Sequence, residues 1–211
     1  MKLWIICSGK SAAAAPDRLS SAEFDAFCEA ELEAPLAPDT SEKSSAVNGR
    51  KIYVGPAQAD LETARLIFPD GEIERESLLA PVLCRSYKDT EQKLPLRRWR
   101  MMARFQRRTA SPRQPESGRA IADRAGTLAR RLREQEADCV LVCHSSFVAP
   151  LLDALRRQGC CFSRSGIFRY APFERILVTA RDLHCGGGSH NCLLTNPGCG
   201  VGRDKAARKS Q

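Results

Sequence analysis

The stretch Cys139-Val140-Leu141-Val142-Cys143-His144-Ser145-Ser146 places polar side chains directly after five apolar ones. A short apolar run without polar alternation is typical of a strand that is covered on both faces in a parallel sheet. Similar runs occur three more times along the chain. We expect the following four segments to be central strands: Leu3–Cys7, Lys51–Gly55, Cys139–Cys143 and Arg175–Ala180.

Helical patterns separate these runs, with apolar residues spaced three or four positions apart. They cover residues 57–67, 94–108, 117–135 and 147–158. Strands that alternate with helices imply a sheet with helices on both faces. The sequence therefore predicts a three-layer α/β/α sandwich with a mainly parallel central sheet.

The length of 211 residues suits one α/β domain, which we place at residues 1–183. Residues 184–211 are rich in Gly and Cys, then basic, without periodicity, and we expect a disordered tail there. No apolar run approaches the roughly 20 residues of a membrane-spanning helix. The short apolar run at the N-terminus does not resemble a signal peptide, so we expect a cytoplasmic protein.

The chain has ten cysteines, and several of them stand singly in segments with strand or helix patterns, such as Cys7, Cys28, Cys139 and Cys143. A small secreted scaffold would instead distribute its cysteines through loops. We expect buried free thiols that pack as small apolar side chains.

The formal net charge of +8 is concentrated, since residues 93–113 hold eight basic residues and no acidic one. That balance favours anionic partners: phosphorylated ligands, nucleic acid or anionic lipid. Within this segment, residues 94–108 predict a basic amphipathic helix. Its arginines either form a solvated face over a core stripe or contact an acidic partner or a membrane surface.

Two loops follow predicted strands and are expected at the carboxyl edge of the sheet, where ligands usually bind. They are Cys7-Ser8-Gly9-Lys10-Ser11 and Cys143-His144-Ser145-Ser146. Gly9-Lys10-Ser11 matches the end of a nucleotide-binding P-loop. That motif needs a glycine five residues before Gly9, where this chain has Trp4, so the backbone cannot wrap phosphates.

Two hydrolase classes also fit poorly. A cysteine-based phosphatase needs an arginine six residues after its thiolate, and the corresponding positions hold Ala13 and Ala149. A Ser–His hydrolase would need a nucleophile elbow of the form G-x-S-x-G, which is missing here, and no acidic residue is clearly placed to orient His144.

Taken together, the loops resemble the histidine phosphatase superfamily, the phosphoglycerate-mutase-like fold. Its members open with a strand ending in Arg-His-Gly, where this chain has Cys7-Ser8-Gly9. A strand, Ser-Pro, an Arg and Thr-Ala follow, a pattern similar to residues 52–64. A late strand ends in a Ser-His-Gly-like turn, matched by Cys143-His144-Ser145. Residues 86–90, 94–96 and 114–117 resemble a bacterial branch, and the likeness spans residues 1–180.

The resemblance implies roles for several positions. In the family, the first-loop histidine attacks phosphorus, two arginines and the second histidine hold the phosphoryl oxygens, and a carboxylate protonates the leaving group. This chain has Ser8 at the nucleophile position, and Cys7 and Ala59 at the arginine positions. The acidic position falls at Pro81. Only Gly9 and His144 match the family.

We therefore expect a degenerate site that is catalytically silent or weak and that binds a phosphorylated or anionic ligand or a protein partner. The alternative is an active phosphomonoesterase whose rearranged site uses His144 and an arginine from residues 97–108, such as Arg97, Arg98 or Arg100. Whether the protein is an enzyme stays open. His144 alone could also be a strand-end histidine with satisfied hydrogen bonds.

The candidate anion-binding residues are Gly9, Lys10, Ser11 and Ser145. A helix that begins within residues 8–11 would supply backbone N–H groups to an anion, or those residues would only cap that helix. We expect no cofactor and no metal. The tail residues His184, Cys185, His190, Cys192 and Cys199 lack the paired C-x-x-C turns of structural zinc sites.

Overall fold

The computed structural model describes residues 1–38, 50–136, 138–162 and 170–180. They belong to one compact unit, Met1–Arg181. The predicted tail at 184–211 and its candidate zinc ligands lie outside the described residues.

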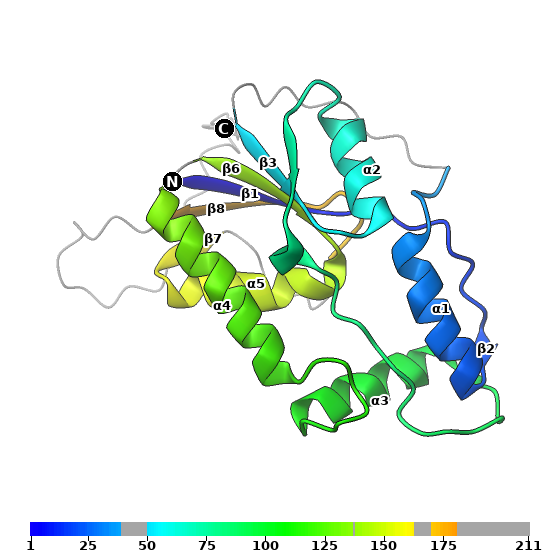
Figure 1. The fold of residues 1–211 in the computed structure, drawn as a ribbon. Helices are drawn as coiled ribbons and strands as arrows, with labels where there is room; N and C mark the ends of the chain where they lie inside the picture. The colour runs from blue at the N-terminus through cyan, green and yellow to red at the C-terminus, as the bar shows by residue number, and fades with distance from the viewer. Residues whose placement is uncertain (39–49, 137, 163–169, 181–211) are drawn as a thin grey trace, which may run out of the picture. The chain divides into compact units, whose positions relative to one another are not determined.

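A six-stranded sheet with the order β4-β3-β6-β1-β8-β7 forms the centre of this unit (Figure 1). Strands β3, β6 and β1 run parallel to one another, as predicted. The short outer strands β4 and β7 were not predicted. The bounds of the six strands are Lys2–Cys7 for β1, Lys51–Val54 for β3, Ile73–Arg75 for β4, Cys139–Cys143 for β6, Cys160–Phe162 for β7 and Arg175–Ala180 for β8.

Strand β8 corrects one expectation, because it runs antiparallel to both β1 and β7. Its burial alternates: Ile176 and Val178 are buried, while the residues between and after them are less so. The apolar run of β8 therefore does not indicate the two-sided burial of a parallel strand. The prediction of a mainly parallel sheet still holds for the other central strands.

Four helices lie within three residues of their predicted bounds, and α1 was not predicted at all. None of the described helices is long and apolar enough to cross a membrane. A small two-stranded sheet, β2 with β5, lies outside the main sheet. The bounds are Arg18–Leu19 for β2, Ser21–Glu33 for α1, Gln58–Ile67 for α2, Leu94–Pro95 for β5, Leu96–Arg108 for α3, Gly118–Gln135 for α4 and Ser145–Arg157 for α5, with a 3₁₀ turn, η1, at Ser77–Leu79.

The side chains of each central strand alternate between two apolar cores, because successive strand residues point to opposite faces. On β1, Leu3 and Ile5 pack with α4 and α5, whereas Ile6 packs with α2 on the other face. This arrangement confirms the three-layer prediction (Figure 1). The described cysteines form no disulfide bond with one another, and Cys7, Cys139, Cys143 and Cys160 are buried as expected.

Helices α1 and α3 share a third apolar cluster beyond the sheet (Figure 1). The fully buried Trp99 ring of α3 stacks on Phe24 of α1, with ring centroids 5.4 Å apart. Its Nε1 donates a hydrogen bond to the Leu19 carbonyl at 2.9 Å. Because indole N–H groups need a partner when buried, this contact fixes the rotation of α3 about its axis.

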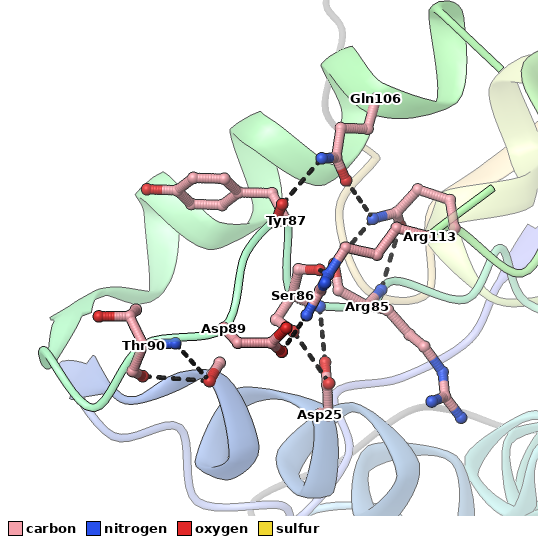
Figure 2. Close-up of polar contacts among 10 residues, drawn as sticks. Asp25, Arg85, Ser86, Tyr87, Asp89, Thr90, Gln106 and Arg113 are labelled. Carbon is pink, nitrogen blue, oxygen red and sulfur yellow. Dashed lines mark hydrogen bonds and ion pairs between the residues drawn. The ribbon is translucent and has the colours of Figure 1, made fainter. Parts of the chain in front are cut away.

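A polar network also holds the loop between η1 and β5 against both helices (Figure 2). The backbone N–H and the Oγ of Ser86 donate to the Asp25 carboxylate of α1, at 2.6 and 3.0 Å. The Ser86 carbonyl accepts from Arg113 Nε at 2.7 Å. From α3, Gln106 Nε2 donates to the Tyr87 carbonyl at 2.9 Å. These bonds tie α1, α3 and the loop into one frame.

Candidate functional site

A cavity of about 430 Å³ lies at the carboxyl ends of the parallel strands. Its wall combines the loop after β1, the first turns of α2 and α5, the loop after η1, helix α1 and one face of α3. The structure brings every predicted site residue to this wall. Those residues are Ser8, Gly9, Lys10, Ser11, His144 and Ser145.

The three positions where the family would place two arginines and an acid also line the cavity. They hold Cys7, Ala59 and Pro81, none of which supplies a charge. Pro81 follows a turn that is fixed from α4, because Arg124 Nη1 donates to the carbonyls of Leu78 and Ala80 at 2.9 and 2.8 Å. The loop is thus held in place without a carboxylate at the position to which the sequence resemblance assigns one.

The loop after β1 does not begin a helix, which corrects both interpretations of residues 8–11. The next helix, α1, begins at Ser21 and is capped by Ser20. The loop is instead held by individual hydrogen bonds. The Ser8 N–H donates to the Cys143 carbonyl at 3.0 Å, and the Gly9 N–H donates to Thr63 Oγ1 at 2.9 Å. The Gly9 N–H is therefore occupied and is not offered to a ligand.

Gly9 is required by close packing. A Cβ on this residue would collide with Leu36 Cδ1 and with the ring of Phe173. The packing around position 9 thus leaves no room for a side chain.

His144 is the N-cap residue of α5. Its Nδ1 accepts a hydrogen bond from the Ser146 N–H at 3.2 Å and lies 2.8 Å from Ser146 Oγ. Since Nδ1 is an acceptor, the proton of the neutral ring lies on Nε2. Burial lowers the pKa of His144, and Arg100 lowers it further, while Glu31 raises it. The imidazole is therefore neutral at pH 7.

Three arginines of α3 line the same cavity: Arg100, Arg104 and Arg107. Their spacing of four and three residues puts them on one side of the helix. Arg100 pairs with Glu31 of α1, and Arg107 Nη1 donates to the Leu83 carbonyl at 3.1 Å. Among the described residues, the Arg104 side chain makes no hydrogen bond and no ion pair. Of the arginines named from sequence, only Arg100 reaches the cavity.

Asp60, in the first turn of α2, was missed by the sequence reasoning. It is fully buried, and a Cβ on Gly55 would collide with its Oδ2. Neither carboxylate oxygen makes a hydrogen bond of good geometry within the described part of the chain. Burial raises the pKa of Asp60 to about 7, against smaller lowering effects from the Ser8 side chain and the His144 backbone. The Asp60 carboxyl lies beneath the loop that follows β1.

A second cavity of about 440 Å³ adjoins the first one. Both are lined by Cys28, Leu32, Leu83 and Cys84, which form a shared wall between α1 and the loop after η1. Burial raises the pKa of Cys28 to about 12, with smaller contributions from Cys84 and Glu31. This thiol is protonated and unreactive at pH 7. Within the described ranges, no cluster of His, Cys, Asp or Glu could hold a metal ion.

No family model and no curated protein matches the sequence. Two crystal structures from Thermus thermophilus, a phosphoglycerate mutase and the protein TTHB049, are each 19% identical to this chain. Each alignment covers 84% of this chain and 92% of the other, with a TM-score of 0.51. A mycobacterial glucosyl-3-phosphoglycerate phosphatase is 15% identical over 74% of this chain and 79% of its own, with a TM-score of 0.48. The chain therefore has the mixed α/β fold of the phosphoglycerate-mutase-like structures.

Proposed function

We propose that the protein binds a phosphorylated small molecule in the cavity under α3 and catalyses phosphoryl transfer weakly or not at all. It would be a degenerate member of the histidine phosphatase superfamily, from the bacterial branch that its loops resemble. The observation that carries the proposal is the row of Arg100, Arg104 and Arg107 along the cavity wall. Guanidinium groups bind phosphate oxygens in a planar, two-point geometry.

The protonation state of His144 favours binding over catalysis. Among the described residues that line the cavity, His144 supplies the only imidazole, and its Nδ1 lone pair already accepts the Ser146 N–H. Its Nε2 carries the proton, so the ring can donate a hydrogen bond to an anion but cannot attack phosphorus. Loss of a single electrostatic stabiliser costs roughly 3 kcal/mol in activation free energy. This chain lacks the nucleophile, both arginines and the acid at the family positions.

Charge decides where in the cavity the anion would lie. Asp60 lies beneath Ser8 and has a pKa of about 7, so its carboxyl becomes negative as the pH rises and then disfavours an anion at the loop after β1. The α3 side offers Arg100, Arg104 and Arg107, with Glu31 as the nearest opposing charge. We expect the phosphate to contact the unpaired Arg104 guanidinium and the Nε2–H of His144.

Calorimetric titration of the purified protein with inorganic phosphate tests the proposal. Arg104→Ala should weaken binding by roughly ten-fold, the effect of one charge-assisted hydrogen bond. Arg98→Ala is the matched control, because it removes the same charge from α3 at an exposed position off the cavity wall. Equal affinities of the wild type and the Arg104 variant would contradict the proposal.

The second candidate is an active phosphomonoesterase with a rearranged site. One observation favours it: Arg100 is near enough to His144 to affect its pKa. Turnover of p-nitrophenyl phosphate that disappears in both His144→Ala and Arg100→Ala would support this candidate against the silent one. Turnover at the level of the buffer would support binding alone.

A further inference from the structure

Helix α3 presents three different faces, because successive residues of an α-helix are turned by about 100°. One face is in the core, with Trp99 and Ala103 fully buried. A second face lines the cavity through Arg100, Arg104 and Arg107. The remaining face points to solvent, and we call it the outer face. It consists of Arg97, Arg98, Met101, Phe105 and Arg108, all of which are exposed.

The centre of the outer face is apolar. Met101 and Phe105 are four residues apart and so lie side by side, with 57% and 58% of their surfaces exposed. Only one other large apolar side chain among the described residues, Leu83, is classed as exposed, at 37%. Apolar residues that are exposed singly are common on protein surfaces, but an adjacent aromatic ring and methionine together indicate a contact surface.

The rim of the outer face is basic. Within the described part of the chain, the side chains of Arg97, Arg98 and Arg108 make no hydrogen bond or ion pair. No acidic residue occurs anywhere in residues 93–113. Three unpaired guanidinium groups around an apolar pair attract a partner that is anionic at its surface and apolar just beneath it.

We propose that the outer face of α3 docks on an anionic lipid membrane surface. Basic helices of this kind lie in the interface plane, with apolar side chains inserted below the headgroups and arginines at the level of the phosphates. The outer face is one helix wide, and the convex side of a helix suits a planar surface. The stacking of Trp99 and the hydrogen bond of Gln106 already hold helix α3 in place before it binds. Docking therefore loses little conformational entropy.

This surface is independent of the cavity ligand, since Arg97, Arg98 and Arg108 do not line the cavity. The two proposals can therefore fail separately. A protein that binds phosphate but ignores vesicles would retain the proposed function and lose this one.

The test is sedimentation of the full chain with phosphatidylcholine vesicles, with and without phosphatidylserine. One variant removes the charge, R97Q/R98Q/R108Q, and a second removes the apolar pair, M101S/F105S. The matched control removes three exposed arginines from α4 and α5, R119Q/R130Q/R157Q. Circular dichroism on heating checks that each variant is folded, which we expect because all the changed residues are exposed.

We expect binding that requires phosphatidylserine, is weakened roughly five-fold for each arginine removed from the outer face, and is also lost in M101S/F105S. The control should change much less. No binding to phosphatidylserine vesicles would overturn the proposal, as would equal losses in the control or full binding by both α3 variants. Tighter binding to a nucleic-acid duplex, reduced by the same variants, would assign the face to nucleic acid instead.

Discussion

Arg100 and Glu31 form an ion pair that joins α3 to α1 at the cavity wall, with Arg100 Nη2 lying 2.9 Å from Oε1 and 3.0 Å from Oε2. Both partners are partly buried, and both act on His144. Burial is the largest cause of the lowered pKa of His144, and within the pair Glu31 raises and Arg100 lowers this pKa, so the two charges modulate the titration of the imidazole in opposite directions.

Removal of one partner should therefore shift the titration of His144 in a known direction. We expect Glu31→Gln to lower the pKa of His144 further, and Arg100→Gln to raise it, measured from the imidazole proton resonances by NMR. Glu29→Gln is the control, since this exposed residue of the same helix pairs with Arg85 instead. Shifts of the opposite sign would show that these charges do not control the ring.

Asp60 should make the protein less stable as the pH rises. Its pKa is raised in the folded state to about 7 from an ordinary value of 3.8. Between about pH 4 and pH 7 the native state therefore keeps a proton on Asp60 that the unfolded state has lost. The contribution to stability is complete below about pH 4 and is lost as the pH rises through 7. Of the neighbouring groups, the Cys143 thiol has a pKa well above 9.0 and stays neutral throughout.

The Asp60→Asn variant isolates this effect. Its free energy of unfolding should exceed that of the wild type by up to about 4 kcal/mol at pH 8, with little difference at pH 4. Urea unfolding followed by tryptophan fluorescence measures both values. Asp70→Asn, at an exposed position after α2, is the control and should leave the pH profile unchanged. A parallel profile for Asp60→Asn and the wild type would contradict the raised pKa.

Trp99 should be essential for the placement of α3. Trp99→Ala empties a fully buried site and should cost about 3–5 kcal/mol. Trp99→Phe keeps a ring against Phe24 but loses the bond to the Leu19 carbonyl, and should cost about 1–2 kcal/mol. Chemical unfolding gives both numbers. A smaller loss in the alanine variant than in the phenylalanine variant would be incompatible with this packing.

Two glycines should respond in opposite ways to alanine. Gly9→Ala brings a Cβ into Leu36 and Phe173 and should destabilise the fold by about 1–3 kcal/mol. Gly126→Ala lies within α4, where the added Cβ comes no closer than 3.8 Å to its nearest neighbour, and should stabilise by about 0.5–1 kcal/mol. Thermal melts of the two variants form a matched pair, and equal shifts would mean that the close approach at Gly9 is not real.

The sequence predicted the central strands well because two-sided burial leaves a direct mark, a continuous apolar run, in β1, β3 and β6. It failed for α1, whose amphipathic pattern is weak. A signal was nevertheless present: Ser20 and Glu23 form a capping box, with Phe24 and Phe27 three residues apart on the buried side. The direction of β8 could not be read, since strand direction depends on pairing partners far away in the chain.

At the site, the strand-end positions were predictable because parallel strands end at one edge of the sheet. The contribution of α3 was predicted only as an alternative, since the rotation of this helix depends on the contacts of Trp99 with Phe24 and Leu19. Asp60 escaped notice because a single carboxylate within a helical segment is usually solvated. Only the three-dimensional packing shows that it is buried.

The wall that the two adjoining cavities share has a consequence for selectivity. Cys28, Leu32, Leu83 and Cys84 close the first cavity on the side of α1 and so set an upper limit on ligand size. With about 430 Å³ available, the space suits a compact metabolite rather than a long chain. Enlargement of the ligand toward this wall would meet the side chains of two leucines and two cysteines, so discrimination there would be steric, while recognition by the α3 arginines would be electrostatic.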